Sequence, residues 1–365
     1  MCLITASALI LSSAQPARAA VKEMDWGDSV NGQPLKLYVL EDGQLRVKLT
    51  NHGARIVSID APDRRGKMAN IVLGFNDPGP YISDPKAYFG ATVGRYANRL
   101  ARGSFSLNGT TYHVPLNNNA NALHGGPEGF STRVWNSRAI GKDSVEFTLE
   151  SPDGDMGFPG QLSVHVRYTL HERSLRITYT ADTTNATVIN LTNHTYFNLA
   201  GEGSGDILHE TVRIDADRYT PVDASLIPTG EIATVAETPF DFRKAIPIGQ
   251  RIDQPNGQLK LAGGYDHNFV LNGRYGELRE AAFVRDPVSG RTLTVLTTEP
   301  AVQFYSGNFL NGSVKGYSGV AYQKHAGFCL ETQHFPDSPN HVGFPSTTLL
   351  LGQTFRSETV FQFGN

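Results

Sequence analysis

Residues 162–170 read Leu-Ser-Val-His-Val-Arg-Tyr-Thr-Leu, with an aliphatic or aromatic side chain at every even position. The same alternation resumes at residues 175–179 and also occurs at residues 145–149. A period of two is typical of antiparallel strands that bury one face and leave the other in solvent. These segments therefore predict neighbouring strands of a large antiparallel sheet.

Residues 104–114 show a second β signature, an Asn108-Gly109 pair between two short alternating runs. Asn-Gly tolerates the positive φ angles of a type I′ turn, so a hairpin is predicted here. Helical periodicity is nearly absent, and we expect short helical turns only near residues 84–88 and 242–248. The 37 glycines and 20 prolines favour many turns. Without repeats or low-complexity linkers, the chain is predicted to form one all-β domain, a large antiparallel β-sandwich over residues 20–365.

The composition limits the class of protein. Hydrophobic residues make up 39% of the 365 residues, which excludes a generally disordered chain. Lys and Arg number 32 against 35 Asp and Glu, a net charge of −3 that argues against a nucleic-acid surface or a polybasic membrane binder. Cys2 and Cys329 are the only cysteines, so a disulfide framework is excluded. We expect a monomer or a weak dimer.

The first residues have the character of a targeting segment. Residues 3–11 are mostly apolar, and Ala-Arg-Ala at 17–19 has the small-x-small pattern of a signal cleavage site, although the usual basic start is missing. The sequence predicts a signal peptide over residues 1–19 and a periplasmic or secreted protein, or a cytoplasmic one if the signal does not function. No later stretch is long and apolar enough to span a membrane, so the mature chain is not expected to insert into one.

Several catalytic signatures are missing from the sequence. It has no P-loop, no dinucleotide fingerprint, no Gly-x-Ser-x-Gly and no His-Glu-x-x-His motif, and no His/Cys cluster has zinc spacing. We therefore predict neither a cofactor nor a metal. Four polar clusters lie beside strand patterns instead: GRYANR at 94–99, NALHGG at 121–126, NLTNHTYFN at 190–198 and GFCLETQHF at 327–335.

In the third cluster the even positions, His194 among them, are polar or amphipathic, while most odd positions are apolar. A strand with an apolar odd face turns its even face to water or to a polar cleft. In the fourth cluster, Glu331 lies in an apolar run, where an unpaired carboxylate is costly. Asp266 and Gln303 add polar groups in two further strand patterns. Each residue alone also has a structural reading, such as an ion pair or a loop cap, but together they suit a neutral, hydroxyl-rich ligand such as a sugar.

The clusters resemble the aldose 1-epimerase (galactose mutarotase) family. The match extends from Asn-His-Gly-Ala at 51–54 to the C-terminus, in the family's order and approximate spacing. Small departures are His52, where the family often has Tyr, and an apolar stretch at 350–352. The segments that carry the resemblance are GRYANR, NALHGG, NLTNHTYFNLAG, GGYDHNF, VQFYSGNFL, GFCLETQHFPDSPNH and FPSTTLLLGQTF.

The resemblance implies a galactose mutarotase-like supersandwich, with the sugar in an open cleft. It implies interconversion of the α- and β-anomers of free aldoses such as glucose and galactose. Glu331 matches the general base at O1, and His194 matches the general acid, expected as an imidazolium at the ring oxygen. The other matched positions, which would hold the sugar, are Asn98, Arg99, His124, Asp266 and Gln303.

Two other classes of function stay open. A glycoside hydrolase also uses paired carboxylates, about 5 to 9.5 Å apart, and Glu331 with Asp266 could form that pair. A non-catalytic sugar-binding module could use the same fold and the same polar groups. The histidine at the acid position argues against the first alternative, and the intact Glu331 and His194 argue against the second.

Overall fold

The computed structural model describes residues 20–84, 86 and 88–365. The predicted signal peptide, residues 1–19, lies outside the described residues. Within the described part, no helix is long and apolar enough to cross a membrane.

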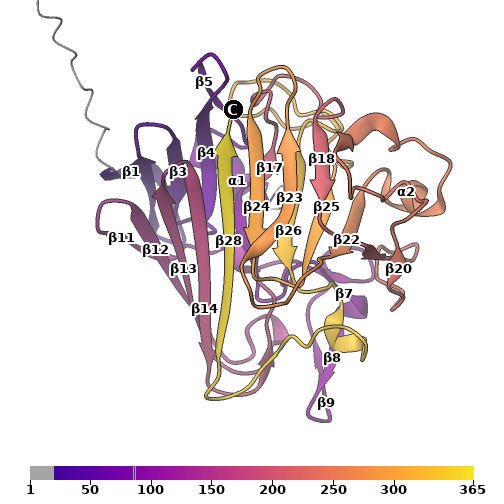
Figure 1. Ribbon diagram of the computed structural model, residues 1–365. Coiled ribbons are helices and arrows are strands. Elements are labelled where there is room, and N and C mark those ends of the chain that lie inside the picture. Colours follow the sequence, from indigo (N-terminus) through magenta and orange to yellow (C-terminus); the bar gives the residue numbers. More distant parts are fainter. Residues whose placement is uncertain (1–19, 85, 87) are drawn as a thin grey trace, which may run out of the picture.

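The alternating segments form three adjacent strands toward one edge of a nine-stranded antiparallel sheet (Figure 1). Residues 162–170 lie in β13, and the even positions of that strand are buried, as the sequence predicts. In spatial order the strands are β11 (Asn136–Ile140), β12 (Ser144–Ser151), β13 (Leu162–His171), β14 (Ser174–Thr183), β28 (Thr354–Gly364), β24 (Thr292–Thr297), β23 (Arg279–Arg285), β18 (Thr211–Ile214) and β21 (Ile246–Pro247).

A six-stranded antiparallel sheet packs against this one, so the fold is the predicted antiparallel sandwich. Its Phe328 and Leu330 join the same buried core as Val164 and Val166 of β13. The strands in spatial order are β17 (Tyr196–Phe197), β26 (Phe328–Gln333), β25 (Ala301–Tyr305), β22 (Asp266–Val270), β19 (Arg218–Thr220) and β20 (Ala233–Thr234).

The remaining strands form one further sheet and several two-stranded pairs beside the two main sheets. A five-stranded sheet contains β1 (Ala20–Val30), β2 (Gln33–Glu41), β3 (Arg46–Thr50), β4 (Arg55–Pro62) and β5 (Met68–Asn70). Four two-stranded pairs are β6 (Ala91–Val93) with β16 (Thr192–His194), β7 (Arg99–Leu100) with β10 (Ala122–Leu123), β8 (Ser104–Leu107) with β9 (Thr110–His113), and β15 (Thr187–Val188) with β27 (Thr348–Leu349). The helices are α1 (Pro78–Ser83), α2 (Gly257–Ala262) and the 3-10 turns Ala101–Gly103, Phe130–Thr132, Asp155–Gly157, Ile248–Gln250 and Ser338–Asn340.

The local predictions that rest on a turn motif or on a period of two were confirmed. Asn108 and Gly109 have φ of 51° and 78°, as the predicted hairpin turn between β8 and β9 requires. Of the expected helical turns, the first has a 3-10 residue at Lys86, and a 3-10 turn begins at the end of the second, at Ile248. The two short α-helices, at 78–83 and 257–262, were not predicted. The second begins at the side-chain cap of Asn256 on Gln258 and Leu259. The expected strand at 190–198 divides into β16 and β17, which pair with different partners, and its residues are buried on both faces.

Candidate active site

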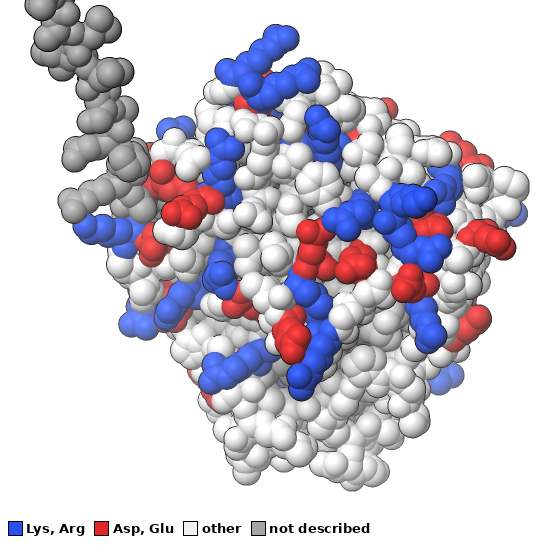
Figure 2. All heavy atoms as spheres, in the orientation of Figure 1, with Lys and Arg blue, Asp and Glu red and all other residues white. Residues whose placement is uncertain are grey.

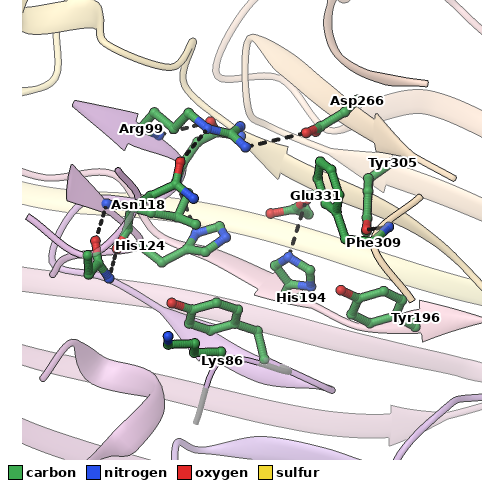
Figure 3. Close-up of a pocket in the computed structure, with 14 residues that line it drawn as sticks. Lys86, Arg99, Asn118, His124, His194, Tyr196, Asp266, Tyr305, Phe309 and Glu331 are labelled. Atoms are coloured by element: carbon green, nitrogen blue, oxygen red, sulfur yellow. Dashed lines mark hydrogen bonds and ion pairs between the residues drawn. The ribbon is translucent and has the colours of Figure 1, made fainter. Parts of the chain in front are cut away.

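A cavity of about 280 Å³ opens between the six-stranded sheet and the β7–β10 pair (Figure 3). This volume is near the lower end of the range for small-molecule sites, so it suits one monosaccharide-sized ligand. Of the predicted site residues, the ones on its wall are Asn98, Arg99, His124, His194, Asp266 and Glu331. Gln303 is absent from the wall and lies behind Asp266, to which it donates a hydrogen bond.

Strand register brings His194 and Glu331 together. Tyr196 of β17 pairs with Cys329 of β26 in an antiparallel ladder. Continuing that register by two residues sets His194 opposite Glu331, and their side chains point toward one another in Figure 3. The His194 Nε2 atom lies 3.7 Å from Oε1 of Glu331, and both side chains are buried.

Burial reverses the usual order of proton affinity in this pair. It lowers the pKa of His194 to about 4, while the residue's own backbone carbonyl opposes the shift. Burial, and then the charge of Asp266, raise the pKa of Glu331 well above 4.5, while Arg99 opposes the rise. In the free pair the carboxyl group therefore binds a proton more tightly than the imidazole does, and His194 is neutral near pH 7. The expected imidazolium is not the resting form, because a buried cation loses its hydration.

His124 is a fixed hydrogen-bond donor. Its Nδ1 accepts the backbone N–H of Asn98 at 3.2 Å, so the neutral ring carries its proton on Nε2. Burial, His194 and Arg99 hold the pKa of His124 well below 6.5, so the ring stays neutral. Asn98 supports this arrangement from a left-handed backbone conformation, with φ of 60°. His124 can thus donate to a sugar oxygen without exchanging its proton.

Asp266 is held as an acceptor from two sides. Its Oδ1 accepts from Nε2 of Gln303 at 2.7 Å, and its Oδ2 lies 3.5 Å from Nη2 of Arg99. The Arg99 Nε donates in turn to Oδ1 of Asn118 at 3.3 Å. Because both Asp266 oxygens already face donors, this carboxylate is poorly placed to protonate a leaving group. The site therefore gives no support to a hydrolase that pairs Glu331 with Asp266.

Sequence reasoning missed part of the cavity wall. The Tyr88 ring contacts those of His124 and His194, with centroids 4.6 and 5.7 Å away. Phe309 stacks on Tyr305 at 5.8 Å and is 61% exposed, so it offers an apolar surface at the rim. Tyr305 is itself a wall residue that was not selected, and the others are Lys86, Asn117, Asn118, Leu123 and Tyr196. Most of these residues lie in loops, where no period marks them; only the Asn-rich run at 117–119 was visible as a signal.

The histidines and Glu331 also form a potential metal-ligand set. Their ligand atoms lie within 4.8 Å of one another. A metal at His124 would have to displace the Nε2 proton that the Asn98 contact requires. Hydrogen bonding to hydroxyl groups therefore fits the arrangement better than metal binding.

On the face in Figure 2, acidic and basic side chains are interspersed and no large area carries one sign of charge.

Comparisons with known proteins agree with this fold and identify the family. Residues 36–362 match the family model described as aldose 1-epimerase. The chain is 46% identical to the galactose mutarotase of Bos taurus, covering 89% of this chain and 93% of the relative, and 39% identical to the aldose 1-epimerase of Escherichia coli, covering 91% and 96%. The crystal structure of galactose 1-epimerase from Lactobacillus acidophilus superposes with a TM-score of 0.84 at 31% identity, covering 95% and 99%. The chain therefore belongs to the aldose 1-epimerase family.

Proposed function

We propose that this protein interconverts the α- and β-anomers of a free aldose, with Glu331 as the base and His194 as the acid. Its family membership, together with relatives named galactose mutarotase and aldose 1-epimerase, makes it an isomerase. Glucose and galactose are the first candidate substrates. The observation that carries the residue assignment is the His194–Glu331 pair, buried on the cavity wall with 3.7 Å between Nε2 and Oε1.

Ring opening needs two coordinated proton transfers. The Glu331 carboxylate takes the proton from the anomeric hydroxyl O1, while His194 gives its Nε2 proton to the ring oxygen O5. The C1–O5 bond breaks as the C1=O1 double bond forms. The aldehyde turns about its C1–C2 bond, and O5 adds to the other face of C1. Its proton returns to His194, and Glu331 returns a proton to O1, so the enzyme is restored.

The reversed proton affinities favour this exchange. The resting pair has one dissociable proton, and the form that reacts, a carboxylate beside an imidazolium, has the same number. Passing between the two forms moves one proton across the pair and needs none from solvent. A buried imidazolium with a lowered pKa is a strong acid toward O5, and a buried carboxylate with a raised pKa is a strong base toward O1.

The other wall residues would hold the sugar in place. Arg99 presents a planar fork of donors, and Asp266 presents acceptors, to hydroxyl groups. His124 donates from Nε2, and Asn98 fixes that ring through its backbone N–H. Gln303 acts through Asp266, whose carboxylate it orients at 2.7 Å.

Polarimetry on freshly dissolved α-glucose and α-galactose tests the proposal. The wild-type protein should accelerate the approach to anomeric equilibrium, whereas Glu331→Gln and His194→Gln should each lose about 10² to 10⁴ in kcat. Glu280→Gln is a matched control, because Glu280 pairs with Arg213 on the half-exposed face of the large sheet. Wild-type rates in the Glu331→Gln variant would refute the base assignment. Release of reducing sugar from a glycoside would instead indicate a hydrolase.

We also propose that residues 1–19 direct export and that residues 20–365 form the mature, single-domain protein. The Ala-Arg-Ala pattern at 17–19 supports this cleavage position. N-terminal sequencing of protein recovered from the periplasm or the medium should give Ala20 as the first residue. Recovery of an intact N-terminus from the cytoplasm would refute export.

A further inference from the structure

Cys329 is a buried group against the acid–base pair that the proposed mechanism does not use. Its Sγ lies 3.6 Å from Nδ1 of His194, on the side of the ring away from Glu331. Cys329 is fully buried in β26, two residues before Glu331 and on the same face of the strand. Its backbone pairs with Tyr196 and Tyr305 in the flanking strands, so the position of the sulfur is fixed by the ladder.

The surroundings of His194 favour a proton on Nδ1. The backbone carbonyl of His194 favours the protonated ring, and of the two ring nitrogens Nδ1 lies on its side. A carbonyl accepts and never donates, so its effect favours a proton on Nδ1. The sulfur lies on the same side and can accept weakly. On the other side, Nε2 faces Glu331, whose carboxyl group binds a proton more tightly than the imidazole does.

We propose that Cys329 is a positioning residue whose sulfur accepts the Nδ1–H of His194, so that Nε2 alone exchanges protons with Glu331 and the sugar ring oxygen. This inference rests on the proposed role of His194 as the acid. The two histidines of the cavity then have opposite tautomers. His124 is locked by a backbone N–H and always donates, whereas His194 keeps its Nδ1 proton and leaves Nε2 free to cycle.

A neutral thiol suits this position better than a carboxylate would. A carboxylate at Nδ1 would stabilise the imidazolium and make it a weaker acid toward the ring oxygen. Burial, with the charges of Glu331 and Asp266, raises the pKa of Cys329, so the group stays a thiol. Several titratable or charged groups lie around the His194 ring or on the same cavity wall. They are Lys86, Tyr88, Arg99, His124, Tyr196, Asp266, Tyr305, Cys329 and Glu331.

Nitrogen-15 NMR of the sugar-free protein at pH 7 tests the tautomer directly, with His194→Gln used to assign the ring signals. The wild type should show a protonated Nδ1 and an unprotonated Nε2. In Cys329→Ala the Nε2–H form should appear, and kcat for mutarotation should fall roughly five- to tenfold, the factor that one hydrogen bond is worth, with KM unchanged. Cys329→Ser keeps an acceptor and should restore both the tautomer and most of kcat.

Val302→Ala is the matched control for lost packing, because Val302 is fully buried in the neighbouring strand β25. It should leave kcat unchanged. The proposal is overturned if wild-type His194 is protonated on Nε2, or if Cys329→Ala changes neither the tautomer nor kcat. It is also overturned if Val302→Ala lowers kcat as much as Cys329→Ala does. A wild-type protein without mutarotase activity would refute the proposed function, while the NMR result would still report the tautomer.

Discussion

His52 should make the fold acid-sensitive in a way that a single substitution can measure. The side chain is buried beside Arg55, and burial, then the Arg55 charge, lower its pKa from 6.5 to about 3. A histidine whose pKa is lower in the folded state binds more protons when the chain unfolds. Stability is therefore complete above the unfolded pKa of 6.5 and is lost as the pH falls from there toward 3.

The size of the effect follows from the two pKa values. Between pH 7 and pH 5 the unfolded histidine becomes almost fully protonated, while the folded one stays neutral. Linkage then gives a loss of about 2 kcal/mol in the free energy of unfolding from this residue. His52→Gln keeps a polar side chain with an N–H and has no titration. The variant should lose about 2 kcal/mol less than the wild type over this interval.

Urea unfolding at pH 7 and pH 5 measures the four free energies needed. The comparison is a difference of differences, so titrations elsewhere in the protein cancel. His113→Gln is the matched control, because His113 is an exposed histidine in β9. Between pH 7 and pH 5 this variant should lose as much free energy of unfolding as the wild type does. If His52→Gln loses as much stability as the wild type, within about 0.5 kcal/mol, then the buried histidine is not the source of the acid sensitivity.

Three further outcomes are expected. The pH profile of kcat should be a bell. Its acid limb should lie near pH 4, where His194 takes up a proton and the pair then holds two, and its alkaline limb at the raised pKa of Glu331. A bell with limbs at 4.5 and 6.5, the ordinary pKa values of these groups, would contradict the reversed order of proton affinity. Asp266→Asn should raise KM for the aldose about tenfold in steady-state polarimetry, with a smaller change in kcat, because the carboxylate is a binding group. Gly90→Ala should lower the free energy of unfolding in urea by roughly 2 to 4 kcal/mol, because Gly90 has φ of 66° and a Cβ would lie 1.9 Å from the carbonyl oxygen of Ile56.

The sequence predicts the fold well because local signals specify it. The period of two at 162–170 and the Asn108-Gly109 turn each need only neighbouring residues to be recognised. By contrast, the α2 helix is six residues long and has too few turns to show a period, so it was missed. The division of the strand at 190–198 into β16 and β17 depends on partners far along the chain, β6 and β26.

The candidate site was predictable as a set of residues but not as an arrangement. Glu331 was marked by a charge in an apolar run, and His194 by a polar face. Their separation depends on the register of β17 with β26, which alternation alone cannot give. The same limit explains Gln303, which was expected at the sugar but lies behind Asp266. Tyr88 was missed because a loop residue with φ of 52° leaves no pattern in the sequence.

β26 explains how a buried sandwich can hold reactive groups precisely. Its side chains alternate, so Phe328, Leu330 and Thr332 enter the space between the sheets, while Cys329 and Glu331 face the site. The Thr332 hydroxyl bonds that of Thr359 in β28 at 2.6 Å, which ties the strand to the large sheet. A slip of one residue would exchange the two faces and put Glu331 into the core at a large desolvation cost. The energy that fixes the register of the core therefore also fixes the base relative to its acid, without any contact from the substrate.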